Sequence, residues 1–168
     1  MNIILIGFMA TGKTTIGRKL AARLGYKFVD TDHYIEYEQE CRVKELFETK
    51  GEGYFRQLET SLLKRLSKVD NTVVSTGGGI LVTDGNMTLI NKIGRSIHLK
   101  ADIEDICERI MRNTKRPLVQ TENPIETIKT LYDRRKELYQ MADITIDTHS
   151  MKMWHVVSKI ITELGKQS

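Results

Sequence analysis

The fold is decided by the stretch Gly7-Phe8-Met9-Ala10-Thr11-Gly12-Lys13-Thr14, which has the spacing G-x-x-x-x-G-K-[ST]. The short apolar run Asn2–Gly7 before it is typical of a buried strand, and Lys13–Leu24 after it carries apolar residues at helical spacing. Glycines at both ends let the backbone curl, so that successive N–H groups point at phosphate oxygens. A glycine-rich turn with a chance lysine is the alternative. The flanking strand and helix both favour a phosphate-binding loop, or P-loop.

This loop predicts a nucleoside triphosphate as one ligand. The helix that begins near Lys13 directs the positive end of its dipole at the phosphates. Lys13 would place a point charge on the β- and γ-phosphates, and the hydroxyl of Thr14 would ligate Mg²⁺. The loop residues expected to bind the nucleotide are Ala10, Thr11, Gly12, Lys13, Thr14 and Thr15.

The rest of the chain alternates between strand and helix patterns. Further strands are predicted at Lys27–Asp30, Thr72–Ser75, Ser96–Lys100 and Ile144–Asp147. Further helices are predicted at Asp32–Phe47, Phe55–Ser67, Ile103–Met111, Pro124–Gln140 and Met151–Leu164. This alternation implies one α/β domain over residues 1–168, with a parallel sheet covered by helices on both faces. Two insertions, Thr31–Glu59 and Arg112–Glu122, are expected to be mobile.

Composition narrows the class of protein. The chain has 168 residues, a net charge of +4 and no apolar run long enough to cross a bilayer. It begins almost directly with a strand pattern, so we expect no targeting segment and a cytoplasmic location. No basic block or basic-aromatic stripe suggests nucleic-acid binding. Cys41 and Cys107 are expected to be reduced thiols. The histidines show no metal-ligand spacing, so surface or packing roles are expected for His33, His98, His149 and His155.

A pair of acidic residues closes the second predicted strand. Asp30 and Asp32 stand one residue apart, so an extended backbone would place both side chains on the same side. Ligands of open parallel sheets bind at the carboxyl ends of the strands. One carboxylate near Mg²⁺ and one on an acceptor hydroxyl would suit phosphoryl transfer. The alternative is that Asp32 caps a helix, with Glu36 in its first turn. Together with the P-loop, the pair favours a functional role.

Three further clusters admit both functional and structural interpretations. Arg56 and Glu59 lie one helical turn apart, which suits a guanidinium fixed to bind a carboxylate, although spacing alone favours an exposed ion pair. Gly77-Gly78-Gly79 follows a strand and permits either close backbone approach to a ligand or a flexible turn. Arg116 lies in a polar loop, from which it could swing onto a transferring phosphoryl group. Of Arg134 and Arg135, at least one is expected on the exposed face of its helix.

The order of these motifs resembles that of the shikimate kinase family. The matching elements are the P-loop, Phe28-Val29-Asp30-Thr31-Asp32, Gly51-Glu52 with Phe55-Arg56 and Glu59, Gly77–Gly79, Arg116-Pro117-Leu118, and Arg135 with Leu138, Tyr139, Ala142 and Asp143. The resemblance covers nearly the whole chain. It implies a three-layer α-β-α P-loop kinase with five parallel strands in the order 2-3-1-4-5. It also implies a substrate-binding segment near residues 31–59, a lid near residues 112–122, and a monomer.

The resemblance also implies roles for individual residues. ATP would be the phosphoryl donor, with Mg²⁺ held by Thr14 and, through water, by Asp30, and with Asp32 as a further candidate ligand. Asp32 would orient or deprotonate the attacking hydroxyl, and Lys13 and Arg116 would stabilise the transferring group. Arg109 and Met153 would contact adenine. The residues expected to bind shikimate are Asp32, Phe47, Phe55, Arg56, Gly77, Gly78, Gly79, Pro117, Leu118 and Arg135, with Glu59 orienting Arg56.

Some positions depart from the family pattern. Ala10 and Val119 replace residues frequent in the family, and Met151-Lys152-Met153-Trp154 stands where a proline often touches adenine. Trp154 is expected to pack within the last helix. Two other functions stay open: another small-molecule kinase of this fold, acting on gluconate or a nucleoside monophosphate, and a non-catalytic nucleotide-binding regulatory module. The paired arginines and the two aspartates favour shikimate.

Overall fold

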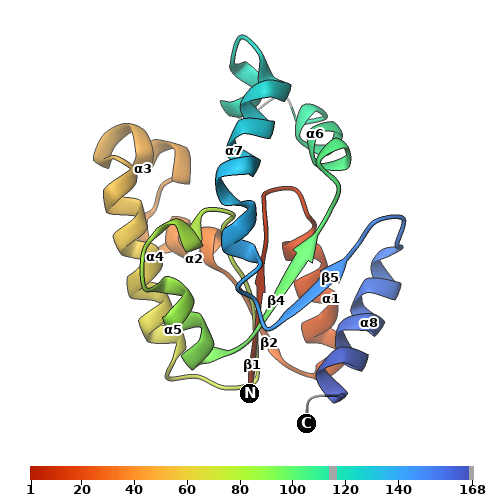
Figure 1. The fold of residues 1–168 in the computed structure, drawn as a ribbon. Helices are drawn as coiled ribbons and strands as arrows, with labels where there is room; N and C mark the ends of the chain where they lie inside the picture. The colour runs from red at the N-terminus through yellow and green to blue at the C-terminus, as the bar shows by residue number, and fades with distance from the viewer. Residues whose placement is uncertain (114–116, 167–168) are drawn as a thin grey trace.

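A parallel sheet lies at the centre of the computed structural model, which describes residues 1–113 and 117–166 (Figure 1). The strands are β1 (Asn2–Ile6), β2 (Lys27–Asp30), β3 (Thr72–Ser75), β4 (Gly94–Lys100) and β5 (Ile144–Asp147). Their order is β2-β3-β1-β4-β5, which confirms the expected topology. The central strand β1 is buried along its whole length, as its continuous apolar sequence predicts, whereas residues of the edge strand β5 alternate between buried and exposed.

The register of the sheet brings the P-loop between two other strand ends. Leu5 in β1 aligns with Ser75 in β3, and Ile6 aligns with His98 in β4. Residues that follow β1, β3 and β4 therefore leave the sheet side by side. This is the switch point of an open parallel sheet, where ligands bind.

Helices cover both faces of the sheet. They are α1 (Lys13–Leu24), α2 (Thr31–Gln39), α3 (Val43–Lys50), α4 (Glu52–Leu66), α5 (Asn86–Ile93), α6 (Ile103–Met111), α7 (Pro124–Tyr139) and α8 (Met153–Gly165), with short 3₁₀ helices η1 (Ile80–Val82) and η2 (Pro117–Gln120). Helices α1 and α8 share one apolar core with the sheet, and residues of α2 to α7 form a second core on the other face. Figure 1 shows α6 and α7 beyond the carboxyl ends of the strands.

Two helical predictions were wrong in detail. The single helix predicted over 32–47 is broken into α2 and α3, because Glu40 adopts a left-handed φ of 54°. The carboxylate of Glu36 accepts a hydrogen bond from the backbone N–H of Val43 at 3.0 Å and so satisfies the start of α3. Helix α5 was not predicted, and η2 occupies part of the predicted polar loop. No helix within residues 1–113 and 117–166 combines the length and apolar character needed to span a membrane.

Candidate active site

The P-loop lysine is held inside the loop that it closes. Helix α1 begins at Lys13, which is 7% exposed. Its Nζ donates hydrogen bonds to the carbonyl oxygens of Gly7 and Phe8, each at 2.8 Å, so the positive charge faces the inside of the loop. Ala10 adopts a left-handed φ of 59°. Its departure from the usual glycine therefore adds backbone strain of about 1 kcal/mol as well as a methyl group.

A group of oxygen atoms lies beside the loop, at the ends of β2 and β3. Oγ1 of Thr14 donates to Oδ2 of Asp30 at 2.6 Å and lies 3.4 Å from Oγ of Ser75. Oδ1 of Asp30 accepts from the backbone N–H of His33, so Asp30 and not Asp32 caps helix α2. The capping role considered for Asp32 is therefore wrong. Oxygen donors of this kind are the ligands that Mg²⁺ prefers, so these residues fit the expected metal.

The carboxyl groups of the half-buried Asp32 and the buried Glu59 converge on Gly77. A Cβ atom at Gly77 would lie 2.5 Å from Oδ1 of Asp32 and 3.1 Å from Oε1 of Glu59, so any larger residue would displace the Asp32 carboxylate. Neither oxygen has a hydrogen-bond partner among the residues described. Burial, reinforced by the charge of Asp30, raises the pKa of Asp32. Burial also raises the pKa of Glu59 to about 7, against the opposing effect of Arg56. The two side chains are placed to hydrogen-bond a small polar ligand.

Carboxylates on its own helix fix the guanidinium of Arg56. Nη1 donates to Oε2 of Glu59 at 2.7 Å, and Nε and Nη2 donate to Oε1 of Glu52 at 3.2 and 3.1 Å. Because Glu59 is fully buried, this is not the exposed pair that spacing alone favoured. The guanidinium packs so closely on Gly79 that a Cβ there would overlap it. A cation held in this way suits bidentate binding of a carboxylate.

Aromatic side chains line the neighbourhood of this cation. The rings of Phe47 and Phe55 lie 5.1 Å apart, and Cζ of Arg56 lies 6.0 Å from the first ring and 5.5 Å from the second. Phe55 is buried and Phe47 half-buried. Both predicted residues therefore stand beside Arg56 and provide an apolar wall next to its charge.

Helix α7 brings a second cation and a tyrosine to the same place. The charge of Arg135 acts on both Glu59 and the Tyr139 hydroxyl, so Arg135 joins the cluster on α4. The hydroxyl of Tyr139 donates to the carbonyl oxygen of Gly78 at 2.5 Å. The ring of Tyr139 stacks on His98 at 5.4 Å between centroids. This place of His98 was not predicted, because it depends on the register of β4 with β1.

A cavity of about 450 Å³ opens on the other side of the P-loop. Its lining includes Ala10, Thr11, Gly12, Thr15, Ile16, Arg109, Asn113, Thr148, Met151, Met153 and Val156. Nη1 of Arg109 donates to the carbonyl oxygen of Ala10 at 3.0 Å. Four of the loop residues predicted to bind ATP therefore meet Arg109 of α6 and Met153 of α8 around one space, whereas Lys13 and Thr14 are not part of its lining. Asn113, Thr148 and Met151 line it as well and were not predicted.

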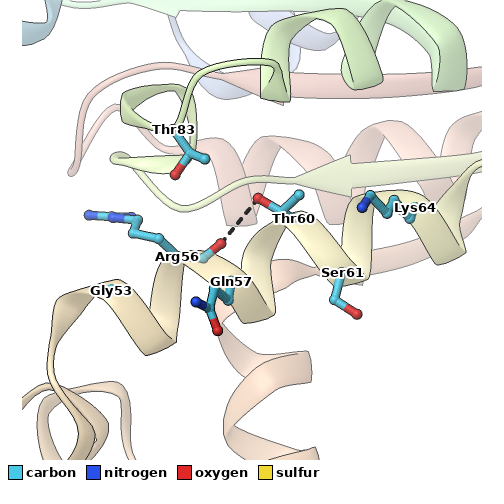
Figure 2. Close-up of a pocket in the computed structure, with 7 residues that line it drawn as sticks. All are labelled: Gly53, Arg56, Gln57, Thr60, Ser61, Lys64 and Thr83. Atoms are coloured by element: carbon cyan, nitrogen blue, oxygen red, sulfur yellow. Dashed lines mark hydrogen bonds between the residues drawn. The ribbon is translucent and has the colours of Figure 1, made fainter.

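A second hollow at the surface shares Arg56 with this site but includes no residue of the P-loop. It measures about 510 Å³ and lies between α4 and the segment after η1 (Figure 2). Its lining consists of Gly53, Arg56, Gln57, Thr60, Ser61, Lys64 and Thr83, with no residue of the P-loop. In Figure 2 the side chain of Arg56 extends away from Lys64 at the far end of the groove. We therefore place the candidate site around the P-loop and not in this groove.

Some predicted residues stand elsewhere or cannot be placed. Arg116 lies outside the described residues, and of Pro117 and Leu118 only their backbone in η2 is described. Trp154 was expected to pack within the last helix but is 58% exposed.

Nδ1 of His149 lies 2.8 Å from Oδ2 of Asp102. This exposed contact was not indicated by sequence spacing.

Comparisons with known proteins agree with this geometry. A family model described as shikimate kinase matches residues 9–165. The shikimate kinase of Thermodesulfovibrio yellowstonii is 42% identical over 167 residues, which cover 99% of this chain and 96% of the relative. That of Rhizobium leguminosarum bv. trifolii is 41% identical and covers 99% and 87% of the two chains.

Solved structures extend the likeness to three dimensions. Shikimate kinase from Acinetobacter baumannii in complex with shikimate matches with a TM-score of 0.93 at 35% identity, over 99% of this chain and 94% of that one. A gluconokinase from Sinorhizobium meliloti reaches a TM-score of 0.55 at 13% identity, over 99% and 97%, and shares the fold alone. The P-loop, the carboxylates at Gly77 and the arginines of α4 and α7 thus occur in a chain that belongs to the shikimate kinase family.

Proposed function

We propose that this protein transfers the γ-phosphoryl group of ATP to the 3-hydroxyl of shikimate, giving shikimate 3-phosphate and ADP. The observation that carries the proposal is the convergence of Asp32, Arg56 and Arg135 beside the P-loop. Charges of opposite sign from α2, α4 and α7 meet there, and each affects the pKa of a neighbour. A small acceptor that carries both a carboxylate and hydroxyl groups matches this arrangement.

The acceptor would bind through its carboxylate and its hydroxyls separately. Arg56 and Arg135 would grip the carboxylate, helped by backbone N–H groups of Gly78 and Gly79. Asp32 would accept a hydrogen bond from the hydroxyl that attacks, through the oxygen that has no partner among the described residues. Phe47 and Phe55 would pack on the ring of the acceptor. These roles explain why a buried carboxylate and a fixed guanidinium stand side by side.

The donor would occupy the P-loop and the adjoining cavity. Lys13 would exchange its contacts with backbone carbonyls for phosphate oxygens, and Arg109 and Met153 would contact the base. Thr14 and Asp30 fit Mg²⁺, since their oxygens already converge beside the loop. The ion, when bound, would neutralise charge on the phosphates.

In the reaction, the 3-oxygen of shikimate attacks the γ-phosphorus in line as the bond to the β-phosphate oxygen breaks. The proton of the attacking hydroxyl passes to Asp32 or to solvent. Lys13 stabilises the charge on the transferring group, and we assign the same role to Arg116 on the expected lid at residues 112–122. Closing of that lid would exclude water and so limit hydrolysis of ATP. A monomeric state and a cytoplasmic location remain predictions.

The two alternatives receive less support. A gluconate kinase shares the fold, but gluconate has no ring for Phe47 and Phe55 to enclose. A regulatory module without activity has no need of a P-loop lysine together with the oxygens of Thr14, Asp30 and Asp32. The pair Arg56–Glu59 would suit the carboxylate of gluconate as well, so the aromatic wall is what favours shikimate over gluconate, while a module without activity has no need of the pair.

An assay of ADP release against a panel of acceptors tests the proposal. Shikimate, gluconate, AMP and CMP are each offered with ATP and Mg²⁺, and only shikimate should support turnover. Lys13→Ala should lower kcat by on the order of 10²- to 10³-fold. Arg135→Ala should mainly raise the KM for shikimate. Turnover of gluconate or a nucleotide in place of shikimate would assign a different acceptor, and no turnover with any of them would favour the regulatory module.

A further inference from the structure

Tyr139, which is not among the predicted site residues, binds the backbone of the glycine turn Gly77–Gly79. The hydroxyl of Tyr139 donates to the carbonyl oxygen of Gly78 at 2.5 Å, and the Tyr139 side chain is almost completely buried. Tyr139 lies one helical turn after Arg135 on α7. Helix α7 therefore carries both Arg135, which is expected to bind the acceptor carboxylate, and a hydroxyl that binds the backbone of Gly78.

The ring of Tyr139 is itself fixed by packing. It stacks on His98, with an angle of 29° between the rings. His98 is aligned with Ile6 in the sheet, and its Cδ2 lies 3.5 Å from the point where a Cβ of Gly7 would stand. The ring of His98 is thus packed against the start of the P-loop, and stacking on it holds the Tyr139 ring and its hydroxyl in one place. Burial raises the pKa of Tyr139 to about 12, so the hydroxyl remains a donor at neutral pH.

Fixing one carbonyl fixes the neighbouring N–H. In a planar trans peptide the C=O of one residue and the N–H of the next point in opposite directions. The carbonyl of Gly78 turns toward Tyr139, so the N–H of Gly79 turns away from it. Gly79 lies against the guanidinium of Arg56. Among residues 1–113 and 117–166 the N–H of Gly79 donates no hydrogen bond.

We propose that Tyr139 is a positioning residue, whose hydroxyl orients the Gly78–Gly79 peptide so that its N–H binds the acceptor carboxylate together with Arg56. This inference rests on the proposed function, because it assigns the carboxylate of shikimate to that N–H. A hydrogen bond to the carbonyl also polarises the peptide and makes its N–H a stronger donor. The competing interpretations are that Tyr139 only fills space above His98, or that its hydroxyl acts through Arg135, which it also contacts. In either case the Gly79 amide proton of Tyr139→Phe would keep its wild-type response to shikimate.

The test removes one oxygen atom. Tyr139→Phe keeps the ring on His98 and loses the donor, so the KM for shikimate should rise about tenfold, while kcat and the KM for ATP change by less than about twofold. Tyr132→Phe is the matched control. Tyr132 lies on the same helix and makes a ring contact with Phe8, but its hydroxyl makes no hydrogen bond within the described residues. Its kinetics should match those of the wild type.

A second measurement separates positioning from packing. Calorimetry compares shikimate with its uncharged methyl ester in both proteins. Tyr139→Phe should weaken binding of shikimate about tenfold and that of the ester by less than about twofold, since the ester lacks the charged carboxylate. In the wild type, the amide proton of Gly79 should move downfield in NMR spectra on addition of shikimate.

The outcomes divide clearly. An unchanged KM for shikimate in Tyr139→Phe, an equal loss of affinity for shikimate and ester, or a Gly79 amide proton that shikimate does not shift would each overturn the inference alone. If Tyr139→Phe fails to fold, a Gly79 amide proton of the wild type that shikimate does not shift still overturns the inference. Absence of shikimate turnover in the wild type and in Tyr132→Phe would reject the proposed function and this inference with it.

Discussion

The guanidinium of Arg56 occupies the space that a Cβ atom at Gly79 would need. A Cβ at Gly79 would overlap its Nη2, although the φ of −104° at Gly79 suits any residue. Gly79→Ala should therefore still fold, but displacement of Arg56 from the buried carboxylate of Glu59 should lower the free energy of unfolding by about 3 kcal/mol. That movement pulls Arg56 from its carboxylate partners. We expect the KM for shikimate to rise about tenfold or more in steady-state assays.

Gly53→Ala is the matched control for this change. A Cβ at Gly53 would contact nothing within 4 Å, and the residue lies inside helix α4. It should leave the KM unchanged and raise the free energy of unfolding by up to about 1 kcal/mol through helix propensity. A Gly79→Ala enzyme with the wild-type KM for shikimate would contradict the placement of Arg56 in the acceptor site.

The buried carboxyl of Glu59 should make stability depend on pH. Its pKa is about 7 in the folded protein and 4.5 in its ordinary state, so the folded chain retains a proton that the unfolded chain has lost. The free energy of unfolding should therefore fall as the pH rises from about 4.5 to about 7, by about 3 kcal/mol from this group. Urea unfolding at pH 5 and pH 8 measures the difference.

Glu59→Gln cannot ionise, so this part of the pH dependence should disappear in the variant. Glu52→Gln provides the control, because Glu52 also binds Arg56 but its side chain is 56% exposed. It should retain the wild-type pH dependence. If Glu59→Gln and the wild type lost the same free energy between pH 5 and pH 8, Glu59 would not be the titrating group.

Single residues also mark the limit of sequence reasoning at the site. The spacing of Arg56 and Glu59 predicted that they meet, and they do. Spacing within the helix could not show whether the pair is buried or exposed. Its burial depends on Gly77 and Gly79, which follow strand β3 and pack against Glu59 and Arg56. The place of Tyr139 beside Gly78 likewise depends on how α7 crosses the sheet.

Strand ends were predicted well where turn-forming residues precede the strand. The predicted bounds of β2, β3 and β5 agree with the structure, and Gly25, Asn71 and Asp143 stand within two residues before them. The break between α2 and α3 depends on the carboxylate of Glu36, which satisfies backbone groups seven residues away. Helix α5 is short, and a tertiary contact fixes its first turn. Neither contact leaves a periodic pattern in the sequence.

That tertiary contact is made by Asn86, which is fully buried at the start of α5. Its Nδ2 donates to the carbonyl oxygen of Ile80, and its Oδ1 accepts from the hydroxyl of Thr60 on α4, both at 2.8 Å. Asn86→Ala would remove this donor from the buried carbonyl oxygen of Ile80, while the Thr60 hydroxyl would keep its hydrogen bond to the carbonyl oxygen of Arg56. The free energy of unfolding should fall by about 2 kcal/mol in urea denaturation.

Asn91→Ala serves as the control, because Asn91 lies in the same helix and is exposed. It should change the free energy of unfolding by no more than about 0.5 kcal/mol. Equal effects of the two substitutions would mean that helix propensity, and not the contact to Ile80 and Thr60, holds α5 in place.

In the proposed function, the P-loop separates two binding regions of the molecule. The nucleotide cavity is bounded by the loop, α6, the segment after β5 and α8. The acceptor side is built from α2, α4, α7 and the glycine turn. Sequence motifs predicted both sets of residues because each motif stands at a strand end, and parallel strands bring their ends to one edge. The motifs could not show that Lys13, Glu59 and Tyr139 would be so deeply buried.

The only tryptophan of the chain offers a test of this division. Trp154 is 58% exposed and follows Met153, which lines the nucleotide cavity. A non-hydrolysable ATP analogue with Mg²⁺ should therefore change the tryptophan emission, while shikimate alone should leave it unchanged. Trp154→Phe should abolish the signal and keep kcat within about twofold of the wild type. If shikimate alone produced the same change as the nucleotide, binding on the acceptor side would reach α8, and the P-loop would couple the two regions through the sheet instead of separating them.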